Sequence, residues 1–226
     1  MVIWAAMGAE TEILPIFPLS DVVLFPRVTT PLHLFEPRYR QMAEHALAGR
    51  RRIGMVTVPP EHVAAMRGDP PVHPVGCAGI VTRARKRSDG RYDILLHGTH
   101  RFRIQSERVR PEGRLYRIAE VALLADAYDP ADANRVAELR TQLVEILSEL
   151  MRASHPGRLP PIPEPWLRDL DDATFVNSLA SAVALPPLEK QSLLEVDGIC
   201  ERLEGLLSFQ RAGLRAPGGP LSGALH

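Results

Sequence analysis

The sequence is poor in cysteine and lysine, and it has no net charge. Its 226 residues include only two cysteines, Cys77 and Cys200, and only two lysines, Lys86 and Lys190. Two isolated thiols provide neither a disulfide framework nor the ligands of a structural zinc site, so we expect free thiols in a reducing, cytoplasmic protein. The 27 basic residues balance 27 acidic ones. No overall field therefore draws the chain to nucleic acid or to an acidic membrane.

Long apolar runs are also missing. No segment approaches the roughly 20 consecutive apolar residues of a membrane span, so we expect no membrane partner. The apolar stretch within residues 1–12 is short, and no basic residue precedes it. It is therefore too weak to predict a signal peptide. We expect residues 1–12 to form a flexible leader whose true start is Met1 or Met7.

Short strands dominate the first half of the chain. Pro37 stands where the first position of a helix belongs, and Gly49 ends that helix. Ser88-Asp89-Gly90 predicts a hairpin turn. Apolar runs predict strands within residues 13–35, 53–58, 75–84, 92–97, 101–105 and 115–124. Six or seven short strands with one helix close most easily into a small β-barrel or a pair of curled sheets, which we place at residues 13–124.

The second half is helical. After an expected linker at residues 125–133, apolar residues from Val136 to Leu150 recur at helical spacing. Asp171 or Asp172 is suited to cap a further helix. We expect helices throughout residues 134–212, interrupted by a proline-rich irregular segment, and a disordered tail at residues 213–226.

Several segments, in order along the chain, resemble those of one known family. They are Leu14-Pro15-Ile16-Phe17-Pro18 through Phe35-Glu36-Pro37, then Val75–Val81, Gly98-Thr99-His100-Arg101-Phe102, Lys190–Glu195 and Arg202-Leu203. The ordered set resembles the amino-terminal domain of Lon proteases over residues 13–212. This resemblance implies an α+β fold, a PUA-like small β-barrel followed by a C-terminal helical bundle. It also implies a domain that holds proteins and does not cut them.

The residues that ATP hydrolysis and peptide cleavage need are missing from the sequence. A phosphate-binding loop requires Gly-x-x-x-x-Gly-Lys-Ser/Thr, and neither lysine follows a glycine. Lys190 and Ser192 are two positions apart on an expected helix, so they point to different faces and form no Ser–Lys pair. The eight histidines show no spacing typical of metal ligands. We predict a non-enzymatic protein with no catalytic residue, metal or cofactor.

Two loops are the first candidates for a binding site. The proline-rich segments 59–74 and 154–169 contain apolar side chains that mobile loops would expose, namely Met66, Leu159, Ile162 and Trp166. Exposed apolar groups beside a groove suit unfolded or extended polypeptides, a protein partner, or self-association into a homo-oligomer. The alternative is that these groups pack between the two halves of the chain.

A basic cluster supports a different hypothesis. Arg83, Arg85 and Arg87 lie on the expected hairpin, and Arg101 and Arg103 follow on the next strand. Because PUA-like barrels often bind RNA, these arginines are candidate nucleic-acid contacts. Single-strand sites usually add aromatic platforms, and few aromatic residues lie nearby. A solvated hairpin is the simpler interpretation, and nucleic acid is the less favoured partner.

Overall fold

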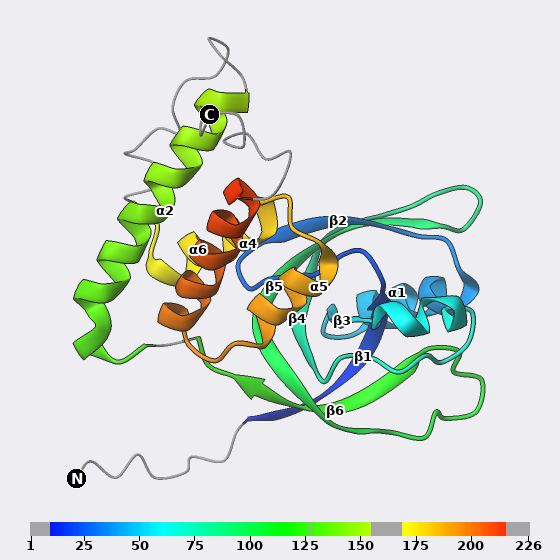
Figure 1. The fold of residues 1–226 in the computed structure, drawn as a ribbon. Helices are drawn as coiled ribbons and strands as arrows, with labels where there is room; N and C mark the ends of the chain where they lie inside the picture. Colours follow the sequence, from blue (N-terminus) through cyan, green and yellow to red (C-terminus); the bar gives the residue numbers. More distant parts are fainter. Residues whose placement is uncertain (1–9, 127, 155–168, 216–226) are drawn as a thin grey trace, which may run out of the picture. The chain divides into compact units, whose positions relative to one another are not determined.

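The computed structural model describes residues 10–126, 128–154 and 169–215 (Figure 1). The chain divides into two compact units, Met1–Ala125 and Asp126–His226. We refer to them as the β unit and the helical unit. The predicted α+β fold, a barrel of short strands with one helix followed by helices, is confirmed.

The β unit is a single six-stranded sheet that closes on itself. Its strands are β1 (Thr11–Leu19), β2 (Thr29–Leu34), β3 (Arg52–Thr57), β4 (Val75–Lys86), β5 (Tyr92–Glu107) and β6 (Arg117–Leu124). Their order in the sheet is β2-β5-β4-β3-β1-β6. A further pairing of β5 with β6 closes the barrel. All neighbouring strands are antiparallel except β1 and β3.

The length of β5 allows this closure. The sequence predicts two strands, at residues 92–97 and 101–105, and the structure joins them into one strand of 16 residues. A bulge in the β4–β5 pairing near Gly98 keeps the ladder continuous. Only glycine fits at position 98, because a Cβ there would collide with the carbonyl oxygen of Phe25.

One predicted strand segment is wrong. Short strands were expected within residues 13–35, one of them at the apolar run Val22–Phe25, but this run is irregular and lies between β1 and β2. Val23, Leu24 and Phe25 are nonetheless buried. The apolar run therefore reflects burial in the core, and Pro26 directly after it prevents regular ladder pairing.

The core of the β unit lies inside the barrel and beneath one helix. Leu14, Ile16 and Phe102 belong to a buried cluster in the barrel. The helix α1 (Pro37–Ala48) begins with Pro37 as predicted and buries Tyr39, Met42, Ala43 and Ala46. A short 3-10 helix, η1 (Pro60–Ala65), lies in the loop between β3 and β4.

The helical unit contains η2 (Pro130–Asp132), α2 (Ala133–Ser154), α4 (Asp172–Ala182), α5 (Pro187–Glu195) and α6 (Ile199–Arg215). The helix α6 packs against α2, α4 and α5. Asp171, one of the two predicted caps, accepts a hydrogen bond from the backbone N–H of Thr174. Among the described residues, no helix is both long enough and apolar enough to span a bilayer.

Candidate binding groove on the β2–β5–β4 layer

Three strands extend past the point where β3 ends. The pairing of β3 with β4 stops at Arg52 and Ile80, whereas β4 continues to Lys86 beside β5. On the other side, β5 pairs with β2 from His97 to Tyr92. We call this part of the sheet the β2–β5–β4 layer. Within the part of the chain that the structure describes, β2 pairs only with β5, and β4 has no strand beside it on the β3 side from Thr82 onwards, so both outer edges are open.

The strand register places side chains in rows across this layer. Pro31, Leu95 and Arg83 form one row, and His33, Asp93 and Arg85 form the next. Residues paired directly across antiparallel strands share a face, and residues two positions apart on one strand also share it. The face opposite these rows holds Ile94, which is 3% exposed and therefore belongs to the core. The two rows thus form the outer face of the layer.

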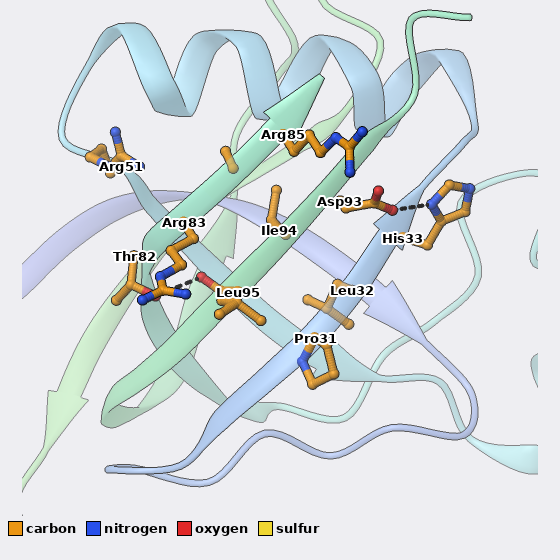
Figure 2. A pocket seen from close by; sticks show the side chains of 11 residues that line it. Pro31, Leu32, His33, Arg51, Thr82, Arg83, Arg85, Asp93, Ile94 and Leu95 are labelled. Carbon is orange, nitrogen blue, oxygen red and sulfur yellow. Dashed lines mark hydrogen bonds and ion pairs between the residues drawn. The ribbon is translucent and has the colours of Figure 1, made fainter. Parts of the chain in front are cut away.

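An open groove of about 680 Å³ follows these strands (Figure 2). Figure 2 shows its lining side chains on β2, β4 and β5, with Arg51 at one end. The groove is lined by Pro31, Leu32, His33, Arg51, Thr82, Arg83, Ala84, Arg85, Asp93, Ile94 and Leu95. The hydroxyl of Thr82 donates to the carbonyl oxygen of Leu95 at 3.2 Å.

Apolar groups are exposed along the same face. Leu95 is half-buried and Pro31 is exposed. Ile80, in the row before them, is 36% exposed, and Phe35, just after β2, is 58% exposed. The Phe35 ring stacks on the ring of His33 with centroids 6.1 Å apart. An apolar ligand placed on this face would cover surface that is now in water.

The charges on the outer face are unevenly paired. The guanidinium of Arg87 donates to both oxygens of Asp93, with Nε to Oδ2 at 2.7 Å and Nη2 to Oδ1 at 3.1 Å. His33 Nδ1 lies 2.7 Å from Oδ1 of the same carboxylate. The hydrogen bonds from Arg87, and then those from His33, lower the pKa of Asp93 to about 2. Arg83 and Arg85 make no ion pair with any residue that the structure describes.

The β4–β5 hairpin has a tight turn at its tip and contacts α1 at its strand ends. Gly90 adopts φ +83°, the left-handed conformation that the predicted turn requires. Lys86 donates to Glu44 of α1 at 2.7 Å, and Tyr92 donates to the same carboxylate at 3.1 Å. These two hydrogen bonds lower the pKa of Glu44. These contacts connect the β4–β5 hairpin to α1.

The predicted basic cluster is split by the fold. Arg83 and Arg85 share the outer face, and Arg87 lies beside them but is engaged with Asp93. Arg101 is only 1% exposed and donates to the carbonyl oxygen of Ala125, so it is a buried side chain. Arg103 is half-buried on the far half of β5, where it pairs with Val75 and Ala122.

The predicted apolar loop residues are only partly described. Leu159, Ile162 and Trp166 lie outside the described residues. Met66 is half-buried after η1, and its carbonyl oxygen accepts a hydrogen bond from Arg38. The role of these four residues in peptide binding stays a prediction.

Sequence reasoning missed Pro31 and Leu95 as groove residues. The run Ile94-Leu95-Leu96 has no alternation of apolar and polar residues, so it indicates burial on both faces. The usable signal was the partner strand, because residues 82–86 contain no large apolar side chain, which indicates that this end of the sheet is exposed.

The groove lining contains one carboxylate and one imidazole, which contact each other. Within the described ranges, no group of three or more His, Cys, Asp or Glu side chains could hold a metal ion. Its only carboxylate, Asp93, is engaged by Arg87 and His33. Open strand edges, an apolar face and cationic side chains together suit an extended polypeptide.

Comparison with known proteins gives a consistent result. Residues 13–210 match the family model described as the ATP-dependent protease La (LON) substrate-binding domain. The chain is 27% identical over 200 residues to a Lon protease of Xanthomonas oryzae, which covers 87% of this chain and 22% of that protein. It is 29% identical over 204 residues to a Lon protease of Desulfovibrio desulfuricans, covering 88% and 22%. The chain thus spans less than a quarter of the length of these two relatives.

Two solved structures have a similar fold. One is a Lon N-terminal domain protein from Xanthomonas campestris, with a TM-score of 0.59 and 25% identity over 88% of this chain and 98% of that one. The other is the N-terminal domain of a Mycobacterium avium complex Lon protease, with a TM-score of 0.67 and 17% identity at the same coverage. At 17% identity, the second likeness concerns the fold alone.

Proposed function

The chain belongs to the family of the ATP-dependent protease La (LON) substrate-binding domain, and we propose that it is a non-catalytic module that binds unfolded or extended polypeptides. The matched region corresponds to a substrate-binding domain. The sequence contains neither a phosphate-binding loop nor a Ser–Lys pair at the spacing that catalysis needs.

The observation that carries this proposal is the groove on the β2–β5–β4 layer. An extended peptide can add to an open strand edge through backbone hydrogen bonds and place alternate side chains on the adjoining face. Pro31 lies on β2 and has no N–H to donate, which limits uncontrolled strand addition at that edge. The edge of β4 from Thr82 to Lys86 lacks a neighbouring strand among the described residues.

A binding assay with a permanently unfolded polypeptide tests the proposal. We would measure fluorescence anisotropy of labelled, reduced and carboxymethylated α-lactalbumin with the wild type, Leu95→Asp and Val109→Asp. Leu95 lies in the groove, whereas Val109 is 95% exposed in the β5–β6 loop and receives the same new charge. We expect wild type and V109D to bind alike and L95D to lose most of the affinity, because a carboxylate disrupts the apolar face.

Equal binding by all three proteins would show that the polypeptide binds outside this groove. No binding by any of them would contradict the proposed function. The same protein should hydrolyse neither ATP nor casein. Turnover that persists through purification and disappears with a single substitution in this chain would contradict the non-catalytic assignment.

A second candidate function is RNA binding. It is favoured by one observation, the stacked rings of His33 and Phe35 on the same face as Arg83 and Arg85. Single-stranded RNA binds through base stacking and cationic contacts, and its affinity falls steeply with salt. Affinity for a labelled single-stranded RNA that falls with salt and weakens in R83A or R85A would support this function, and flat curves at low salt would eliminate it.

A further inference from the structure

The groove has an excess of positive charge that its own carboxylate does not balance. Both oxygens of Asp93 accept hydrogen bonds from Arg87, and Oδ1 also contacts His33. The carboxylate is thus committed to the hairpin turn, although Arg85 lies directly across from it in the register. Arg83 and Arg85 are left without an acidic partner among the described residues.

The spacing of these two arginines matches the repeat of an extended chain. They are two residues apart on β4, after the bulge at Val81/Arg83, and they pair in regular register with Leu95 and Asp93. Their Cα atoms are therefore separated by about 6.6 Å, the two-residue repeat of a strand. Acidic side chains at positions i and i+2 of an extended peptide have the same repeat, and guanidinium groups bind carboxylates with two parallel hydrogen bonds.

The apolar residues beside the two arginines would contact the apolar side chains of such a ligand. Leu95 and Pro31 continue the row that begins with Arg83. A ligand held by Arg83 and Arg85 would therefore extend neighbouring side chains over an apolar surface. A cationic segment would be repelled there, because no carboxylate of the groove is free to meet it.

We propose that this groove selects extended peptide segments in which two acidic side chains, two positions apart, accompany an apolar residue. This inference rests on the proposed polypeptide-binding function and adds a charge preference to it. The ligand class is an acidic and apolar unfolded segment, rather than any exposed apolar segment.

Three matched peptides test the preference. The first is a short labelled peptide with Glu at positions i and i+2 and Leu at position i+4, so that all three side chains lie on one face of the extended chain. The other two peptides carry Gln or Lys in place of both Glu residues. We expect the Glu peptide to bind about tenfold more tightly than the Gln peptide, since two exposed ion pairs together contribute about one tenfold step in affinity. The Lys peptide should bind more weakly than either, and the preference should shrink as salt rises.

Two double variants locate the effect. R83Q/R85Q should abolish the preference for Glu over Gln, whereas R67Q/R91Q, which removes two exposed arginines outside the groove lining, should retain it. Matching circular dichroism spectra and unfolding curves would confirm that both variants are folded. The preference would be overturned if wild type bound all three peptides equally, or if R67Q/R91Q lost it as fully as R83Q/R85Q.

These failures are separable from failure of the proposed function. Equal affinity for the three peptides, together with loss of binding in L95D, would remove the charge preference and leave the polypeptide-binding function intact. No binding of either the peptides or the unfolded polypeptide would overturn both. A single-stranded RNA that displaces the Glu peptide from wild type, and fails to bind R83Q/R85Q, would overturn the peptide assignment in favour of nucleic acid.

Discussion

Two arginines, one from each unit of this molecule, have opposite surroundings. Arg202, on α6 of the helical unit, is fully buried, and Arg85, on β4 of the β unit, is exposed. The Arg202 guanidinium donates to Asp126 at 2.9 Å, to Asn177 at 3.1 Å and to the carbonyl oxygen of Leu193 at 3.0 Å. Arg85 has no such partners in the described structure. The same residue type thus joins several segments in one place and faces solvent in the other.

The difference indicates which arginines are structural and which are free to bind. A buried guanidinium is tolerated only when its donors are satisfied, because an unpaired buried charge is costly. The Arg202 network joins α4 through Asn177, α5 through Leu193 and the start of the helical unit through Asp126. A guanidinium in water keeps its hydration and is available to a ligand.

Removal of the buried arginine should have the largest effect on stability. In Arg202→Met, the carboxylate of Asp126 loses its main partner while it remains largely buried, with 14% of its side chain exposed. We expect the free energy of unfolding to fall by about 3–5 kcal/mol. Urea denaturation followed by circular dichroism would measure this loss in the transition of the helical unit.

Two further variants sharpen this prediction. Arg211→Met changes an exposed arginine of the same helix, which donates a hydrogen bond to Gln142 at 3.0 Å, and should leave the transition unchanged within error. The double variant R202M/D126L removes both charges and should recover part of the loss, because an apolar pair avoids the unpaired carboxylate. A loss in R202M no larger than in R211M would contradict the structural role of Arg202.

Much of the fold could be predicted because local patterns agree with it. Pro37 begins α1, and Gly90 adopts the left-handed conformation in the β4–β5 turn. Asp171 caps α4. Each of these residues acts within a few positions of itself along the chain. The extent of β5 and the irregular path of Val22–Phe25 depend on partners far away in sequence, and periodicity carries no information on them.

The groove could be predicted only in part, for the same reason. Arg83 and Arg85 were identified as members of a basic cluster on the expected hairpin. The burial of Arg101 and the partial exposure of Leu95 depend on which segments cover each side of β5. The residue type alone would predict the reverse, an exposed arginine and a buried leucine. The contact between Asp93 and His33 could not be predicted either, because His33 lies on β2, 60 positions away in the sequence, and only the strand register brings the two together.

A smaller effect on stability is expected from removal of Asp93, the carboxylate in the groove lining. Hydrogen bonds from Arg87 and His33 lower the pKa of Asp93 from 3.8 to about 2 in the folded protein. A lowered folded-state pKa stabilises the protein above the unfolded value, and this contribution disappears as the pH falls through about 2. The stability difference between wild type and Asp93→Asn should therefore be constant above about pH 5 and should close towards pH 2.

Urea denaturation between pH 6 and pH 2 would test this, with an NMR titration of the Asp93 carboxyl as the direct readout. Glu112→Gln removes an exposed carboxylate that makes no ion pair with the described residues, and it should show no such convergence. A carboxyl of Asp93 that titrates near 3.8 would mean that Arg87 is not committed to it. The distinction between committed and available arginines in the groove would then lose its basis.

The smallest effect on stability should come from the available arginine itself. Arg85→Gln removes a charge without a protein partner, so the unfolding curve should match that of wild type. Its affinity for the acidic peptide should nonetheless fall about threefold, half of the tenfold step on a logarithmic scale, if the two arginines act additively. Arg85→Lys keeps the charge but loses the two parallel hydrogen bonds, so its affinity should lie between those of R85Q and wild type. A clear loss of stability in R85Q would place Arg85 with Arg202 as a structural side chain, because only a group that the folded protein already uses destabilises it when removed.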